Sequence, residues 1–218
     1  MALPTYLELV NDVLVRMREP EVSTVQENTL SKLVGRLVND AKRQVEDAYN
    51  WNALTDTLMV ESVANTYGYV LNGSGSRFKV IDVQDITNRM PLESLPTLTM
   101  SQYLLMDKTP GKPQYYNFNG IDVESGDTQV DIFPVPAVGI TMYFNLYIPQ
   151  ENLVGDTDKL YVPKEPVILG AFARALVERG EDGGLNSSEA YALYRSSLAD
   201  HIAIEASRFI EEETWEAV

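Results

Sequence analysis

NTLSKLVGRLVNDAKRQVEDAYNW, residues 28–51, is the stretch that decides the fold of this chain. Its apolar residues recur at the i, i+3, i+4, i+7 spacing of one helical face: Leu30, Leu33, Val34, Leu37, Val38, Ala41, Val45, Ala48 and Tyr49. The opposite face is charged, with oppositely charged residues four apart at Arg36/Asp40, Lys42/Glu46 and Arg43/Asp47. The pattern predicts a long helix that buries its apolar stripe against partner helices and exposes all of these charges.

A shorter helix is expected just before it, over residues 5–17. Its apolar stripe is narrow, and Pro4 suits a helix start. Residues 18–25 should form a loop, because Pro20 disfavours helical backbone in the residue before it. The two helices therefore predict an N-terminal helical hairpin.

After Leu54 the apolar period changes from that of a helix to that of a strand. The segment from 90 to 113 contains several prolines and predicts a loop with a short helix at 100–106. No helical crossover separates the predicted strands, which favours an antiparallel sandwich or barrel-like module. The predicted strands are 57–63, 66–71, 77–83, 114–119, 128–133 and 140–148.

Residues 150–163 are acidic and should be irregular. Pro166 then predicts the start of a helix over 167–179, and the glycines of 180–184 end it. A last helix is expected to about residue 212, with Asn186 and Glu189 as a capping pair. The predicted fold is α+β: a helical bundle of two terminal hairpins, residues 1–54 and 151–218, with an inserted β module at 55–150.

Composition limits the possible functions. The chain has 218 residues, of which 32 are acidic and 17 basic, for a net charge of −15. That balance argues against tight nucleic-acid binding, and it suits a surface past which DNA moves without sticking. No cysteine is present, which excludes disulfides and thiolate chemistry. No apolar run is long enough to cross a membrane, and we expect no signal peptide.

Residues that could carry chemistry are few. His201 is the one histidine, so a catalytic triad or a histidine metal site would have to use it. Residues 122–127 faintly resemble a calcium loop, but a hairpin turn fits better because the spacing and the final glutamate are missing. With 32 acidic residues, carboxylate pairs carry no specific signal. We predict no enzyme activity and no catalytic, cofactor or metal residues.

Two segments carry a family resemblance. Leu9-Val10-Asn11-Asp12-Val13-Leu14 followed by Arg18-Glu19-Pro20-Glu21-Val22-Ser23-Thr24-Val25 is similar to the opening of bacteriophage head-to-tail adaptor (connector) proteins, the group that includes the tail-tubular A protein. Trp51, at the end of the long helix, fits the same pattern. The proline-opened helix of 162–184 resembles the later part of these adaptors, whereas the β region matches in plan only.

The resemblance implies a structural virion protein that forms a ring, typically of about twelve subunits, between the portal and the tail. The ring would contact the portal protein and the tail nozzle or tail tube protein, and DNA would pass through it without specific binding. Assembly would follow synthesis in the host cytoplasm, with no membrane contact. Candidate portal-docking residues are Phe209, Ile210 and Trp215. Candidate subunit-interface residues are Arg36, Asp40, Arg43 and Asp47.

Two other functions remain open from the sequence. The β module carries several tyrosines that could form a glycan- or host-surface-binding face in a tail module. At strand spacing, tyrosines also occur commonly as cross-strand core pairs. A peptidoglycan hydrolase is the weaker alternative, because no motif assigns two convergent carboxylates.

Overall fold

The computed structural model describes residues 3–106, 110–180 and 185–208, and it is an α+β protein. The chain divides into two compact units. The first contains residues 1–53 and 150–218 and is helical. The second contains residues 54–149 and carries the strands, so the helical unit is interrupted in sequence by the β unit.

Helices α1 and α2 begin close to their predicted starts, whereas α4 begins at Lys164, two residues before the predicted start at Pro166. Helix α1 is Tyr6–Arg16, and Thr5 caps it in a capping box with Glu8. Helix α2 is Thr29–Ala48, capped by Asn28 with Ser31. Helix α4, Lys164–Arg179, ends at Gly180 in the left-handed conformation (φ 63°), which glycine adopts without strain.

Helix α5 is Leu185–Ala206, and it does not begin at the predicted capping residue. Asn186 lies inside this helix, so the predicted capping pair with Glu189 is wrong. Tyr191 of this helix is 46% exposed, whereas Tyr194 is buried. Apolar residues lie on several sides of this helix, so the sequence marks its buried face only weakly.

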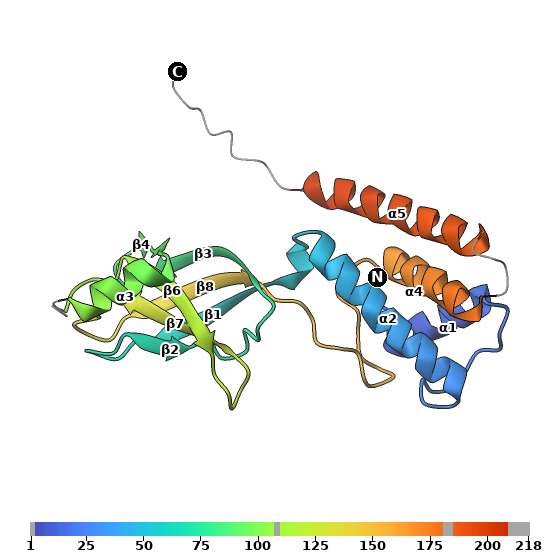
Figure 1. Cartoon of the computed structure of the whole chain (residues 1–218), viewed down its shortest axis with the longest axis horizontal. Coiled ribbons are helices and arrows are strands. Elements are labelled where there is room, and N and C mark those ends of the chain that lie inside the picture. The colour runs from blue at the N-terminus through green and yellow to red at the C-terminus, as the bar shows by residue number, and fades with distance from the viewer. Residues whose placement is uncertain (1–2, 107–109, 181–184, 209–218) are drawn as a thin grey trace, which may run out of the picture. The chain divides into compact units, whose positions relative to one another are not determined.

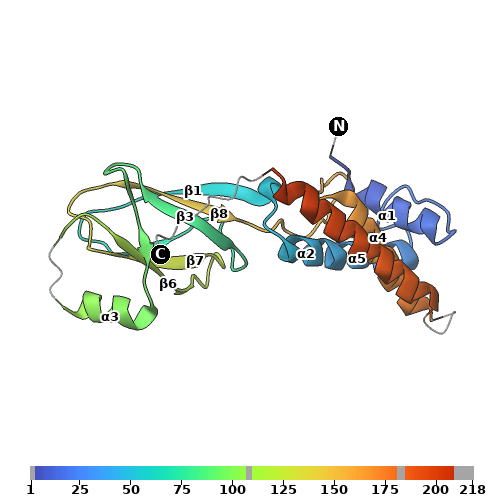
Figure 2. The ribbon, with the colours of Figure 1, turned by 90° about the horizontal axis from the view of Figure 1, so that it is seen from above.

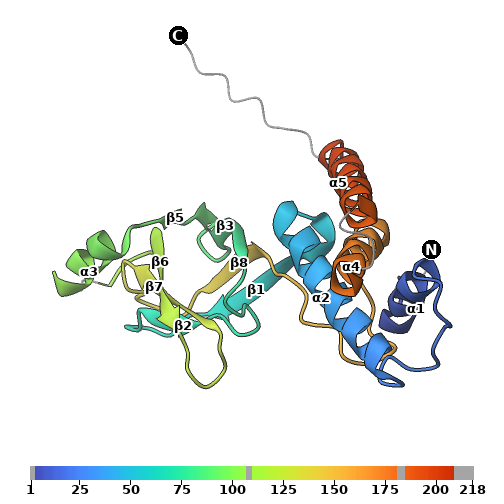
Figure 3. The same ribbon diagram turned by 45° about the vertical axis from the view of Figure 1, so that its right-hand side comes forward.

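Helix α4 packs against α1, α2 and α5. Figure 3 shows α4 with α2 on one side and α5 on the other. At Gly170 a side-chain Cβ would lie 3.2 Å from both the Ala41 Cβ and the Tyr194 ring, so the glycine allows α2 and α5 to approach this point together. The grouping of these helices into two hairpins stays a prediction.

Within the described residues the strands form two four-stranded sheets, and they do not close into a barrel. Figure 1 shows the strands of each sheet side by side. The first has the order β1-β8-β3-β4 and is antiparallel. The second has the order β2-β7-β6-β5 and is mixed, because β5 pairs with β6 in parallel. The strands are β1 Thr55–Glu61, β2 Gly68–Val70, β3 Lys79–Asp85, β4 Met90–Pro91, β5 Glu93–Ser94, β6 Tyr115–Ile121, β7 Thr128–Phe133 and β8 Thr141–Tyr147.

One hydrophobic core lies between the two sheets. Val60, Met142 and Phe144 of the first sheet and Val130 and Ile132 of the second belong to the same buried cluster. The alternation of buried and half-exposed residues along β8 is the period-two pattern that predicted a strand. The sandwich part of the prediction agrees with this shared core, and the barrel-like part is wrong.

The proline-rich segment differs most from its prediction. It forms the short strands β4 and β5 and the helix α3, Thr97–Leu105, which starts earlier than the predicted helix. Helix α3 packs on β6 and β7 (Figure 2). Strand β5 pairs with β6 in the parallel direction, and helix α3 lies in the connection between them, as a parallel pair requires a long crossover.

Candidate interaction surfaces

The charged face of α2 is the surface that the sequence assigns to subunit contacts. Arg36, Asp40, Arg43 and Asp47 recur every three or four residues and are all exposed. The Arg43 guanidinium lies 3.3 Å from the Asn152 side-chain oxygen, to which it donates a hydrogen bond. The helix therefore presents a stripe of two cations and two anions to solvent, which we call the α2 charge stripe.

Two charges that the sequence analysis placed on this exposed face are buried instead. Lys42 is 1% and Glu46 3% exposed, and their side chains form an ion pair at 3.1 Å. The Lys42 ammonium also donates to the backbone carbonyls of Gln150 and Glu151, at 2.6 and 2.8 Å. Lys42 thereby fixes α2 to the segment that returns from the β unit.

The helix period contained the signal for this burial. Lys42 follows the buried Val38 by four residues and precedes the buried Val45 by three, so it lies on the inward side of α2. The prediction failed because it weighted residue type over helical position. A lysine on an apolar face requires acceptors from another segment, and the sequence does not show which segment supplies them.

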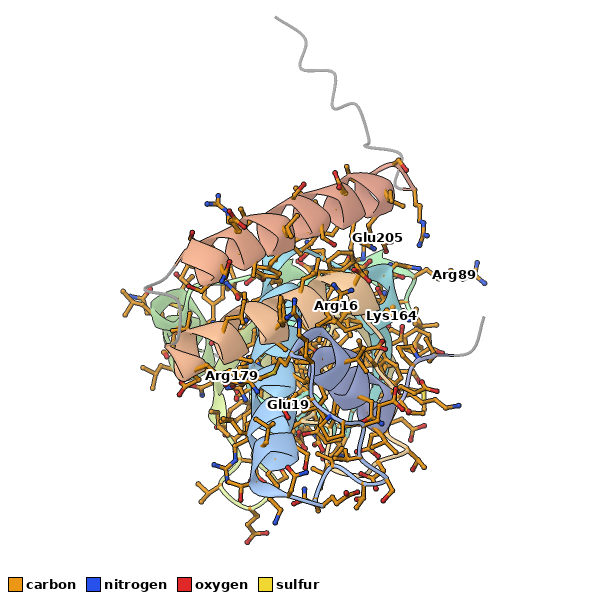
Figure 4. All side chains as sticks on the ribbon, turned by 90° about the vertical axis from the view of Figure 1, so that its right-hand side faces the viewer. Arg16, Glu19, Arg89, Lys164, Arg179 and Glu205 are labelled. Carbon is orange, nitrogen blue, oxygen red and sulfur yellow. The ribbon has the colours of Figure 1, made fainter. Side chains whose placement is uncertain are left out.

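Ion pairs join α1 and the loop after it to α4. Arg16 contacts Glu165 at 3.1 Å, and Arg179 pairs with Glu19 (Figure 4). The Arg179 guanidinium also donates to the Met17 carbonyl at 3.5 Å. These contacts hold the start of the loop 18–25, part of the segment that carries the family resemblance, against α4.

A groove of about 1000 Å³ lies in the helical unit, among the start of α1, residues 51–53 after α2, the start of α4 and the end of α5. Leu3, Tyr161 and Ile204 line it and are each about half exposed, at 46, 48 and 55%. Glu205, labelled in Figure 4 beneath α5, accepts hydrogen bonds from the Asn52 backbone at 3.0 Å and from Arg208 at 2.9 Å. Four segments that are distant in sequence form this groove, so it could not be predicted from the sequence.

His201 also lines this groove. Its ring nitrogen Nδ1 lies 2.8 Å from the Ser197 carbonyl oxygen, one turn earlier on α5, so it donates a hydrogen bond there. Among the described residues, no group of three or more histidine, aspartate or glutamate side chains could hold a metal ion. The described lining of the groove includes apolar and charged side chains, so the groove offers a contact surface of mixed polarity.

The residues predicted to dock on the portal, Phe209, Ile210 and Trp215, lie outside the described part of the chain.

The calcium-like stretch, residues 122–127, is a hairpin turn between β6 and β7, as predicted. The Asp122 carboxylate accepts hydrogen bonds from the Ser125 backbone and hydroxyl, both at 2.9 Å, and these bonds lower its pKa. Its acceptor oxygens serve the turn itself.

None of the helices in the described residues is both long and apolar enough to cross a membrane. The candidate sites found among the described residues are surfaces, namely the α2 charge stripe and the groove in the helical unit. Exposed charges of both signs and a groove of mixed polarity are typical of a protein that works through contacts with other proteins.

The comparison with protein families agrees with that class. Residues 4–210 match the family model of the SU10 adaptor protein. The match covers most of the chain, so the chain belongs to this family of phage adaptor proteins, and the resemblance to head-to-tail adaptors read from the sequence is confirmed. A search of the curated proteins found no match.

Proposed function

We propose that the protein is a head-to-tail adaptor that forms a ring between the portal and the tail of a phage particle. The observation that carries this proposal is the family match over residues 4–210. The ring contains about twelve copies, joins the portal protein to a tail nozzle or tail tube protein, and encloses the channel through which DNA leaves. The protein acts in the virion by binding and not by catalysis.

Two physical features support the ring. Closing a ring needs two different, complementary patches on each subunit, and the α2 charge stripe provides one that carries both signs of charge. The net charge of −15 suits a channel wall, because a wall that repels phosphates weakly does not retain the duplex.

Sedimentation velocity of the purified chain, alone and mixed with the portal protein from the same genome, tests the proposal. We expect a closed ring alone or a ring-on-ring complex with the portal. A chain that stays monomeric in both samples would contradict the proposal. A variant lacking residues 209–218 then tests the portal-docking residues: it should self-associate as the full chain does and bind the portal more weakly.

A further inference from the structure

The second sheet has one outer face that is only partly covered. Val130 and Ile132 of β7 point into the core, so Gln129, Asp131 and Phe133, which alternate with them, lie on the outer face. Helix α3 covers the Phe133 end of this face, where Tyr103 lies against the Phe133 ring at 5.1 Å between centroids. The Gln129 and Asp131 end has no such cover from α3.

A hollow of about 540 Å³ lies at this uncovered end. Residues 65–70, which include strand β2, form one wall, and Asn119, Gln129 and Asp131 complete the lining. This volume is in the range of pockets that hold small ligands. Gly68 is the register partner of Asp131, and a Cβ there would lie 3.4 Å from the Asp131 Oδ1 atom. The glycine therefore leaves the space beside that carboxylate oxygen without a side chain.

The environment of the Asp131 carboxyl favours a neutral ligand that forms hydrogen bonds. It is 7% exposed, and its Oδ2 atom accepts a hydrogen bond from the Asn119 amide at 2.8 Å. Burial raises the pKa of this carboxyl above its ordinary value, and the Asn119 hydrogen bond opposes that shift. The Asn119 hydrogen bond uses the Oδ2 atom, so the Oδ1 atom retains acceptor capacity for a ligand.

We propose that this hollow, which we call the β2–β7 pocket, binds a neutral carbohydrate. Sugar hydroxyls both donate and accept hydrogen bonds, which matches a lining of one carboxylate with the amides of Asn119 and Gln129. Tyr67, 40% exposed at the wall, supplies an aromatic ring on which a sugar face can pack. The described lining contains no lysine, arginine or histidine, so it does not suit a phosphate or another anion.

The pocket binds sugar without cleaving it, because glycoside hydrolysis needs two carboxyl groups across the bond and Asp131 is the one carboxyl of the described lining. This inference does not depend on ring formation. It gives the β unit a recognition role in addition to the proposed adaptor function.

The test is isothermal titration of the full chain with three neutral probes: maltotriose, N,N′,N″-triacetylchitotriose and mannotriose. We expect at least one to bind with a dissociation constant of about 0.1–1 mM. Tyr67→Ala and Gln129→Ala should each weaken binding at least about tenfold. Tyr67→Phe, which keeps the ring, should bind as the original chain does. Tyr191→Ala, which changes an exposed tyrosine of α5, is the matched control.

Absence of binding to all three probes at about 10 mM would overturn the proposal. Equal binding by the Tyr67→Ala and Gln129→Ala variants would also overturn it, because the sugar would then bind elsewhere. Should Tyr67→Ala fail to fold, Gln129→Ala decides the question alone, since Gln129 lies on the outer face of its strand.

Discussion

Gly35 is a residue whose role in α2 is set by packing. Alanine normally stabilises a helix interior relative to glycine, by about 1 kcal/mol. A Cβ at position 35 would however overlap the Tyr6 hydroxyl and lie 2.9 Å from the Val25 Cγ1 atom. We predict that Gly35→Ala lowers the free energy of unfolding by about 1–3 kcal/mol, measured by urea denaturation. The double variant Gly35→Ala/Tyr6→Phe should recover part of the lost stability. An increase in stability in the Gly35→Ala variant would contradict this packing of α1 against α2.

Lys42 gives a second prediction at this scale. Lys42→Met should destabilise the protein by about 3–5 kcal/mol, because it leaves the Glu46 carboxylate buried without its cation. Lys42→Met/Glu46→Leu should recover part of this loss. Full recovery is not expected, since the carbonyls of Gln150 and Glu151 still lose their donor. A Lys42→Met variant as stable as the original chain in urea denaturation would show that the pair is not buried.

Residues also show where sequence reasoning reached its limit. The positions of Arg36, Asp40, Arg43 and Asp47 on the exposed side of α2 follow from helical periodicity alone, and the structure places them there. Whether another subunit binds them is a question of assembly that a single chain does not answer. The helical period places Lys42 on the inward side of α2, whereas its two carbonyl acceptors are more than one hundred residues away and cannot be predicted from a local pattern.

The return segment, residues 150–163, is an element held by carboxylates. Asp156 accepts a hydrogen bond from the Val25 backbone at 2.9 Å, and Asp158 accepts from the Val154 and Gly155 backbones, both at 2.7 Å. For Asp156 a side-chain hydrogen bond from Thr24 and the backbone bond lower the pKa, and for Asp158 the two backbone bonds do so.

A lowered folded-state pKa means that the stabilisation is present above the unfolded pKa, about 3.9, and is lost as pH falls through the folded value. We predict that the urea midpoint of the original chain declines below about pH 4, and that Asp156→Asn/Asp158→Asn reduces this decline. Asp200→Asn, on the exposed side of α5, is the control. An unchanged acid profile in the double variant would contradict these roles.

At the scale of elements, the sequence located most helices and strands within a few residues, because each long element has a clear apolar period. Strand β7 was predicted with the observed bounds. The strands β4 and β5 were missed because each has only two residues and lies among prolines, which the prediction treated as loop signals. Such short strands exist through pairing with distant partners, and period-based reasoning cannot detect them.

For the whole molecule, the order of elements predicted the α+β class, and short motifs in the loop 18–25 and the proline-opened helix identified the family. The sandwich-or-barrel question could not be decided from the sequence, since alternation along strands is the same in both. The groove of the helical unit and the β2–β7 pocket were also hidden, because both are formed by segments that meet only after folding.

Ring assembly leads to the last prediction, which concerns the α2 charge stripe. Reversing its cations in Arg36→Glu/Arg43→Glu should shift sedimentation from the ring toward monomers, because the stripe would then present four anions to the neighbouring subunit. Both side chains are exposed, so the urea midpoint should change little. The ring of the original chain should also weaken as salt is raised from about 0.05 to 0.5 M, since exposed charge pairs are screened over that range.

Lys32→Glu, which changes an exposed lysine one turn before the stripe, is the matched control and should leave the ring intact. If the double variant forms rings as readily as the original chain while both remain folded, the stripe is not the subunit contact, and the groove of the helical unit, lined in part by Leu3, Tyr161 and Ile204, becomes the surface to mutate next.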